Sequence, residues 1–256
     1  MDKLRDDDEV LTMDLPEHTT LEGFANDIAA KIVVKTEEQV QNRVELASMI
    51  VQNWMTNHGL QLASQKTELV ILTRKRNFCE KIQVEVYGSK VDAAKSLKYL
   101  GVKVDQKLKF WEQIKSASEK ADKVMGALCR LMPNIAGPKS SKRKTLLSVI
   151  HSILLYGAEI WADALQHKSY RKKKAAVQRR GALRVTSAYC TTSEAAVPVI
   201  GSMPPPIDLL AIERKRVYER LEIEGNPEIM KREEKELTLS KWNRRWTSEK
   251  TGKWTR

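Results

Sequence analysis

Cysteines, long apolar runs and repeats are few or missing in this chain of 256 residues. Its three cysteines, Cys79, Cys129 and Cys190, lie far apart with no CxxC spacing, so we expect neither a disulfide framework nor a zinc knuckle. The acidic start, Met1–Asp8, lacks the apolar core of a signal peptide. No apolar stretch reaches the roughly 18–20 residues that cross a bilayer. These absences predict an intracellular protein, with the nucleus a compatible location, and no membrane partner.

Positive charge is concentrated in the second part of the chain. Residues 1–100 carry 13 basic and 16 acidic side chains, whereas residues 101–256 carry 32 and 17, within a total of 45 basic and 33 acidic residues. A basic surface attracts phosphate backbones without selecting a sequence, because binding releases condensed counterions. Polyanion binding is therefore expected of the second part.

The first part reads as strands around one helix. Residues 19–24 and 28–34 predict a hairpin whose turn is Ala25-Asn26-Asp27. A Thr36/Gln39 capping box then predicts an amphipathic helix that ends at Gly59. Its buried stripe is expected to contain Val40, Val44, Ala47, Val51 and Trp54. Further strands are predicted at residues 68–73, 82–86 and 97–104, with Tyr87-Gly88-Ser89 as a turn.

Beyond Asp105 the apolar period becomes helical. Helices are predicted from Phe110 to Pro133, from Ser140 or Ser141 through Ile160, and over residues 169–187, 207–221 and 228–246. The second of these is apolar over much of its circumference and should be the most buried. The fold class predicted from these patterns is α+β, with an all-α second part.

The turn Phe24-Ala25-Asn26-Asp27 is the feature that most suggests a catalytic site. Polymerases hold catalytic magnesium with adjacent carboxylates on a strand-turn-strand hairpin. Asn-Asp in a hairpin turn is much more often ordinary turn chemistry. From the residues alone, the turn reading is favoured.

Several segments, in the same order along the chain, resemble the reverse transcriptases of non-LTR (LINE-like) retrotransposons of the insect type. Phe24-Ala25-Asn26-Asp27 is similar to their FADD or YADD box, with asparagine in place of the first aspartate. The other segments that carry the resemblance are Gly59–Glu68, similar to GL-x-L-(N/A)-x-x-KTE; Leu97–Val102, similar to LKYLGV; Leu131–Pro138; Ile153–Trp161; and Ser248–Thr255. The resemblance extends over nearly the whole chain from about Leu15.

The resemblance implies an incomplete antiparallel palm sheet with one packing helix, followed by a thumb-like helical region. The implied divisions are an acidic flexible start at 1–14, a partial palm at 15–105, a thumb-like bundle at 106–200 and a C-terminal helical extension at 201–256. The implied partner is an RNA or DNA template-primer, with Mg²⁺ and no small-molecule cofactor.

Particular residues acquire roles only through the resemblance. Asp27 and Asn26 would belong to the metal site, and Lys66 would donate a proton to the departing pyrophosphate as a general acid. Without the resemblance, Lys66 would be interpreted as an ordinary exposed lysine before a strand. Lys98, Tyr99, Leu100 and Gly101 would form a primer-grip-like hairpin, which is also consistent with a plain buried strand.

Two departures from the family pattern imply that this chain alone is inactive. Asn26 replaces a metal-binding carboxylate, and a neutral amide cannot balance the charge of Mg²⁺. The fingers and the first palm segment of the family would lie before Met1. The chain is therefore expected to be a fragment of an RNA-directed DNA polymerase, or alternatively a non-catalytic basic nucleic-acid-binding module derived from the same element.

The helix predicted over residues 169–187 is the expected nucleic-acid-binding element. Its candidate contacts are basic: Arg171, Lys172, Lys173, Lys174, Arg179, Arg180 and Arg184. A solvated charged helix face is the equally weighted alternative. Trp242, Trp246 and Trp254 lie among basic residues and could stack on bases, although packing of a terminal helix is favoured. The spacing of His58, His151 and His167 indicates no metal site.

Overall fold

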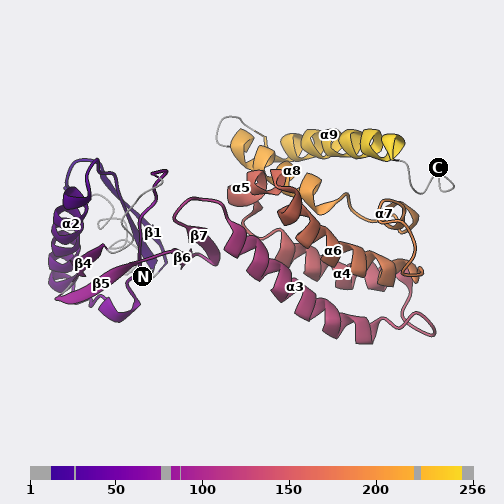
Figure 1. Ribbon diagram of the computed structural model, residues 1–256, viewed down its shortest axis with the longest axis horizontal. Coiled ribbons are helices and arrows are strands. Elements are labelled where there is room, and N and C mark those ends of the chain that lie inside the picture. The colour runs from indigo at the N-terminus through magenta and orange to yellow at the C-terminus, as the bar shows by residue number, and fades with distance from the viewer. Residues whose placement is uncertain (1–12, 26, 76–81, 87, 222–225, 250–256) are drawn as a thin grey trace. The chain divides into compact units, whose positions relative to one another are not determined.

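The computed structural model describes residues 13–25, 27–75, 82–86, 88–221 and 226–249 (Figure 1). The chain forms two units. The first contains Met1–Leu97 and Asp105–Leu108, and the second contains Lys98–Val104 and Lys109–Arg256. The α+β class predicted from the sequence is confirmed.

The first unit begins with the predicted hairpin, made by β1 (Thr19–Phe24) and β2 (Asp27–Ile32). The strands are antiparallel, and their register runs from Thr19 opposite Ile32 to Phe24 opposite Asp27. Ala25 has a φ of 52°, the left-handed conformation that a two-residue hairpin turn requires. The hairpin forms a sheet of its own rather than joining the other strands.

Helix α2 (Glu37–Asn57) follows with its predicted N-cap, Thr36. The Thr36 side chain makes no capping bond, and the Gln39 side chain accepts a hydrogen bond from the backbone N–H of Lys35 at 3.2 Å, one residue before the N-cap. The helix therefore begins where it was predicted, but the two bonds of a capping box are not formed. Of the predicted buried stripe, Val40, Ala47 and Val51 are buried, whereas Val44 and Trp54 are half-buried.

The remaining strands of this unit form a mixed sheet against α2. Its order is β3 (Leu69–Val70), β5 (Ser89–Ala94), β4 (Gln83–Val86). Strands β4 and β5 pair antiparallel, but β3 and β5 pair parallel, so the expectation of a purely antiparallel sheet is wrong. Alternation within a strand predicts which face is buried, as at Val84 and Val86, but carries no information about the direction of a distant partner.

The second unit begins within a hairpin of β6 (Ser96–Tyr99) and β7 (Val102–Asp105). Its helices follow in chain order: α3 (Trp111–Leu131), α4 (Ser140–Leu154), α5 (Ala158–Trp161), η2 (Ala162–Gln166), α6 (Lys168–Thr186), α7 (Ala196–Ile200), α8 (Ile207–Leu221) and α9 (Pro227–Ser248). Helices α3, α4 and α6 pack on one another around the main core.

The helix predicted to run through Ile160 is interrupted. It ends at Leu154, and Gly157, with a φ of 64°, starts the separate helix α5. The break changes the helical phase, which buries Trp161 and leaves Ile160 58% exposed. The prediction of one continuous helix through Ile160 is therefore wrong.

The loop between α3 and α4 is held by the buried side chain of Arg143. Its Nε donates to the carbonyl of Pro138, its Nη2 to that of Pro133, and its Nη1 to that of Arg184, each at 2.7 Å. A guanidinium suits this position because its donors form a rigid planar fork. One arginine therefore connects the proline-containing loop to α4 and α6.

Within the described part of the chain, no single helix is long and apolar enough to cross a membrane. The pair Ser140–Leu154 and Ala158–Gln166 meets the length and composition together but is bent by 56°.

Candidate nucleic-acid interface

The FADD-like turn does not form a metal site in the described part of the chain. Asp27 is exposed, directly opposite Phe24 at the end of the hairpin, and Asn26 lies outside the described residues. No group of three or more His, Cys, Asp or Glu among the described residues could hold a metal ion. One carboxylate is too few for Mg²⁺, which needs several oxygen ligands. The described residues therefore do not fit the implied ion.

Lys66 is the last residue of the short 3-10 helix η1 (Ser64–Lys66), and its side chain is exposed. Its backbone N–H donates to Ala63 O at 2.9 Å. Among the described contacts, none joins Lys66 to Asp27. The catalytic roles implied for Lys66 and Asp27 stay predictions.

The predicted primer-grip-like residues lie at the tip of the β6–β7 hairpin. Lys98 is exposed and Tyr99 is half-buried in β6, while Leu100 and Gly101 form the turn. Both turn residues have positive φ, 45° and 83°. The hydroxyl of Tyr156 donates to the carbonyl of Leu100 at 2.8 Å, which connects this turn to the segment between α4 and α5.

Lys174 departs from its expected role as a nucleic-acid contact, because its side chain is 0% exposed. Its Nζ donates to the carbonyl of Leu154 and lies 3.8 Å from the centroid of the Trp161 ring. Burial lowers the pKa of Lys174 to about 7. A lysine inside the core cannot reach a phosphate, so the expectation is corrected at this position.

Other predicted basic contacts of α6 also have partners within the unit. Arg180 forms an ion pair with Asp122 at 2.7 Å, and Lys173 lies 3.8 Å from Glu119. Arg179 donates to the carbonyls of Cys190 and Thr192, and Arg184 donates to the side chain of Asn134 at 3.3 Å. These side chains join α6 to α3 and to neighbouring loops, which reduces their freedom to bind phosphates.

The first turns of α6 are different. Lys172 is exposed and Arg171 is half-buried, and neither has a described side-chain partner. The first turn contains no acidic residue. The helix dipole adds positive potential here, so the start of α6 favours anions.

Aromatic rings lie beside these cations. The ring of Tyr170 has its centroid 4.7 Å from that of Trp111, at the start of α3, and 5.1 Å from that of His167. Lys173 Nζ lies 5.7 Å from the Trp111 ring centroid. We call Trp111, His167, Tyr170, Arg171, Lys172 and Lys173 the aromatic–basic cluster. Sequence reasoning missed the aromatic members, since Trp111 and Tyr170 are far apart in the chain and no local pattern joins them.

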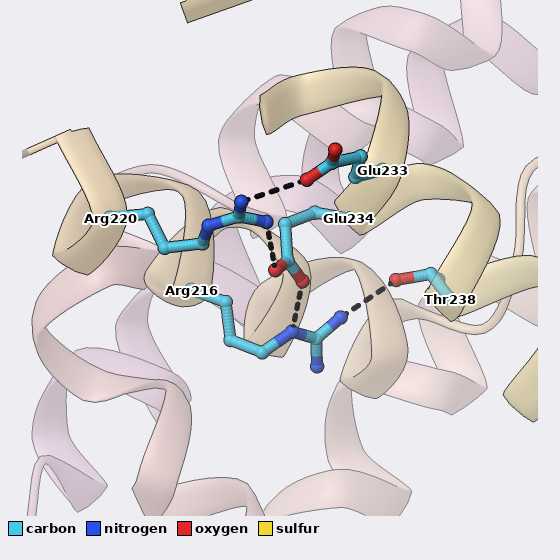
Figure 2. Close-up of polar contacts among 5 residues, drawn as sticks. All are labelled: Arg216, Arg220, Glu233, Glu234 and Thr238. Carbon is cyan, nitrogen blue, oxygen red and sulfur yellow. Dashed lines mark hydrogen bonds and ion pairs between the residues drawn. The ribbon is translucent and has the colours of Figure 1, made fainter. Parts of the chain in front are cut away.

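Two basic residues of α8, Arg216 and Arg220, hold α9 against α8 (Figure 2). Arg216 Nε and Arg220 Nη1 both donate to the buried carboxylate of Glu234, the latter at 3.1 Å. Arg220 also pairs with Glu233 at 2.8 Å, and Arg216 Nη2 donates to Thr238 Oγ1 at 3.1 Å. Glu233 and Glu234 therefore neutralise the charges of Arg216 and Arg220, so these two arginines do not extend the nucleic-acid interface.

The tryptophans of α9 are half-buried at positions 242 and 246, whereas Trp254 lies outside the described residues. Trp242 lies four residues after the buried Thr238, on the side of α9 that faces α8. This favours packing over base stacking for Trp242.

Comparison with known proteins finds relatives in insects. The chain is 26% identical over 204 residues to a putative 115 kDa protein in type-1 retrotransposable element R1DM of Drosophila melanogaster, an overlap of 79% of the chain and 20% of that protein. In Nasonia vitripennis it is similar to two retrovirus-related Pol polyproteins, from type-1 retrotransposable elements R1 and R1 2. The identities are 24% over 255 residues and 22% over 254 residues. These overlaps cover 90% and 91% of the chain, and 74% and 62% of the two proteins. No family model and no solved structure matches the chain.

Proposed function

The chain is homologous to Pol polyproteins of insect type-1 (R1) retrotransposable elements, and we propose that it is a reverse transcriptase fragment that holds nucleic acid. The first unit would correspond to part of the palm, and the helical second unit to the thumb and its extension. The partner would be a template-primer of RNA or DNA. This role requires phosphate and base contacts but no bond-making chemistry from the chain itself.

The observation that supports this proposal best is the aromatic–basic cluster. Arg171 and Lys172 have no described side-chain partner at a helix start that lacks acidic residues. Side chains of this kind bind a phosphate backbone without base preference. The neighbouring rings of Trp111 and Tyr170 supply the aromatic surface that proteins combine with basic grooves to bind single strands.

We assign no catalytic step to the chain. Polymerisation needs several carboxylates around its divalent ions, and Asp27 is a single exposed carboxylate. Mg²⁺-dependent incorporation of nucleotides on a primed RNA template tests this directly. The unaltered chain and its Asn26→Asp variant should both be inactive, and incorporation by the unaltered chain would contradict the proposal.

Binding is best tested by fluorescence anisotropy with a labelled primer-template at several salt concentrations. The Arg171→Ala/Lys172→Ala variant should bind more weakly at every salt concentration. If both residues contact phosphates, the slope of log affinity against log salt should fall by about 1.4 to 1.8, from roughly 0.7 to 0.9 per contact.

A matched control separates local contacts from net charge. Lys231 and Arg232 are adjacent exposed residues of α9, also without a described side-chain partner. Lys231→Ala/Arg232→Ala removes the same two charges from another helix of the same unit. It should change the slope by much less, and equal slopes for the two variants would show that binding follows total charge instead of the cluster.

A further inference from the structure

Tyr156 is an aromatic side chain held in one position by two connections. Its hydroxyl donates to the carbonyl of Leu100 at 2.8 Å, and its own backbone carbonyl accepts a hydrogen bond from Trp161 Nε1 at 2.9 Å. The ring nevertheless remains accessible, since Tyr156 is 54% exposed. A large, ordered and exposed ring can stack on a ligand at little cost in conformational entropy.

The backbone of the Leu100–Gly101 turn lies close to the Tyr156 ring. A Cβ atom on Gly101 would lie 3.0 Å from Tyr156 Cε1 and 3.2 Å from its hydroxyl. Leu100, next to it, has a φ of 45°, which is uncommon for a residue with a side chain. The two-residue hairpin turn requires this conformation, and the turn places the Leu100 carbonyl where it accepts the hydrogen bond from Tyr156.

The residues beneath the ring are closely packed. Gly157 packs against Val102, so closely that a Cβ atom on Gly157 would lie 2.6 Å from Val102 Cγ2. Trp161, which donates a hydrogen bond to the Tyr156 carbonyl, is fully buried, and Lys174 Nζ lies 3.8 Å from its ring centroid. Lys174 belongs to α6, the helix whose first turns bear Arg171 and Lys172. The hairpin tip and the basic helix therefore share one core.

Positive charge is also available near the hairpin tip. Lys98 is exposed two residues before Leu100, and Lys103 is half-buried two residues after Gly101. A phosphate can be contacted by such side chains while an adjacent base stacks on a ring.

We propose that the exposed face of Tyr156 stacks on an unpaired base of a bound nucleic-acid strand, with the Leu100–Gly101 turn holding the ring in place. This inference rests on the proposed function and adds a contact residue to it. The ligand class is a single strand, or the single-stranded portion of a template-primer, because the bases of a duplex are already stacked on one another.

Two substitutions isolate the ring. Tyr156→Phe and Tyr156→Leu both lose the hydrogen bond to Leu100, but only the first keeps an aromatic face. With a single strand that contains 2-aminopurine, wild type and Tyr156→Phe should quench the fluorescence on binding, and Tyr156→Leu should quench it less. The affinity of Tyr156→Leu should be lower than that of Tyr156→Phe by roughly 5-fold to 100-fold.

Thermal unfolding of both variants shows whether the fold is retained. A measurement without any substitution complements them: a strand that carries 5-iodouracil should photocrosslink to Tyr156 of the unaltered chain. Equal affinity and equal quenching for the Phe and Leu variants, or crosslinking only to other residues, would overturn the role of Tyr156. If the unaltered chain binds no nucleic acid, the proposed function itself fails, so the two failures are distinguishable.

Discussion

The docking of α9 on α8 should depend strongly on the carboxylate of Glu234, which acts beside the ion pair of Arg245 with Asp208 at 2.9 Å. The buried residues of α9 among those described are Met230, Glu234 and Thr238. The polar contacts that Glu234 and Thr238 make with α8 are drawn in Figure 2. Glu234 is 6% exposed and accepts hydrogen bonds from Arg216 and Arg220. Glu234→Gln keeps the shape of the side chain but removes its charge.

The loss of docking free energy expected for Glu234→Gln follows from the burial of Glu234 and the partial exposure of its arginine partners. Removing one partner of a fully buried ion pair costs about 3–5 kcal/mol, and a hydrogen bond to a charged group contributes roughly 1.5–3 kcal/mol. Arg216 and Arg220 are partly exposed and can be solvated when the charge is lost, so the lower end applies. We expect a loss of about 2 kcal/mol in α9 docking, which corresponds to roughly a 30-fold higher population of the undocked helix.

Amide hydrogen exchange measured peptide by peptide is the suitable assay, because it reports the opening of one helix separately from global unfolding. Peptides from α9 should lose protection by roughly 30-fold, while peptides from α3 and α4 should change little. Glu236→Gln is the control, since Glu236 is exposed on the same helix without a described side-chain partner. Equal loss of protection in the two variants, or none in either, would refute the reasoning.

The docking of α9 should weaken as the pH falls. Partial burial favours a raised pKa for Glu234, but hydrogen bonds from Arg216 and Arg220 outweigh it and lower the pKa below the ordinary value of 4.5. A carboxyl whose pKa is lower in the folded state contributes stability above its unfolded pKa, and this contribution is lost as the pH falls through the folded pKa. The protection of α9 amides, measured relative to their intrinsic exchange rates at each pH, should therefore fall below about pH 4.5 in the unaltered chain, and much less so in Glu234→Gln.

Three further substitutions test the packing of the second unit by thermal or denaturant unfolding. Gly157→Ala should destabilise it by about 2 kcal/mol or more, because of its positive φ and the close contact of its Cβ with a neighbouring side chain. The control Gly126→Ala, in an open helical position, should stabilise it by about 0.5–1 kcal/mol. Arg143→Lys should cost about 2–4 kcal/mol, since a lysine cannot reach all the carbonyls that the guanidinium bonds. In the unaltered chain, the free energy of unfolding should rise between about pH 7 and 10.5, because Lys174 holds its proton over that range in the unfolded chain but not when it is buried. Lys174→Met should abolish this rise.

Local patterns predicted the elements of the fold well and their partners poorly. The hairpin at residues 19–32, helix α2 and helix α8 follow from alternation, capping residues and helical spacing. Strand β5 (Ser89–Ala94) was missed because its small and polar residues give no clear apolar alternation. Its parallel pairing with β3 is a non-local contact, which depends on tertiary packing.

In the candidate site, too, local sequence spacing carried information about burial but not about contacts between distant residues. Lys174 was predicted to be exposed because it lies in a run of basic residues, although it precedes the buried Val177, Gln178 and Gly181 by three, four and seven positions. That spacing places it on the apolar face of α6, so the signal was present but outweighed by composition. The proximity of Trp111 to Tyr170 had no such signal.

Net charge and contact charge are therefore different quantities in this chain. Pairing an arginine with a glutamate leaves the net charge of +12 unchanged, so the long-range attraction that accelerates encounter with a polyanion is retained. The number of phosphates contacted depends instead on exposed cations without partners, and Arg143, Lys174, Arg216 and Arg220 do not qualify. The association rate should consequently respond to any change in total charge. The equilibrium salt slope should respond mainly to a few positions, of which Arg171 and Lys172 are the first to test.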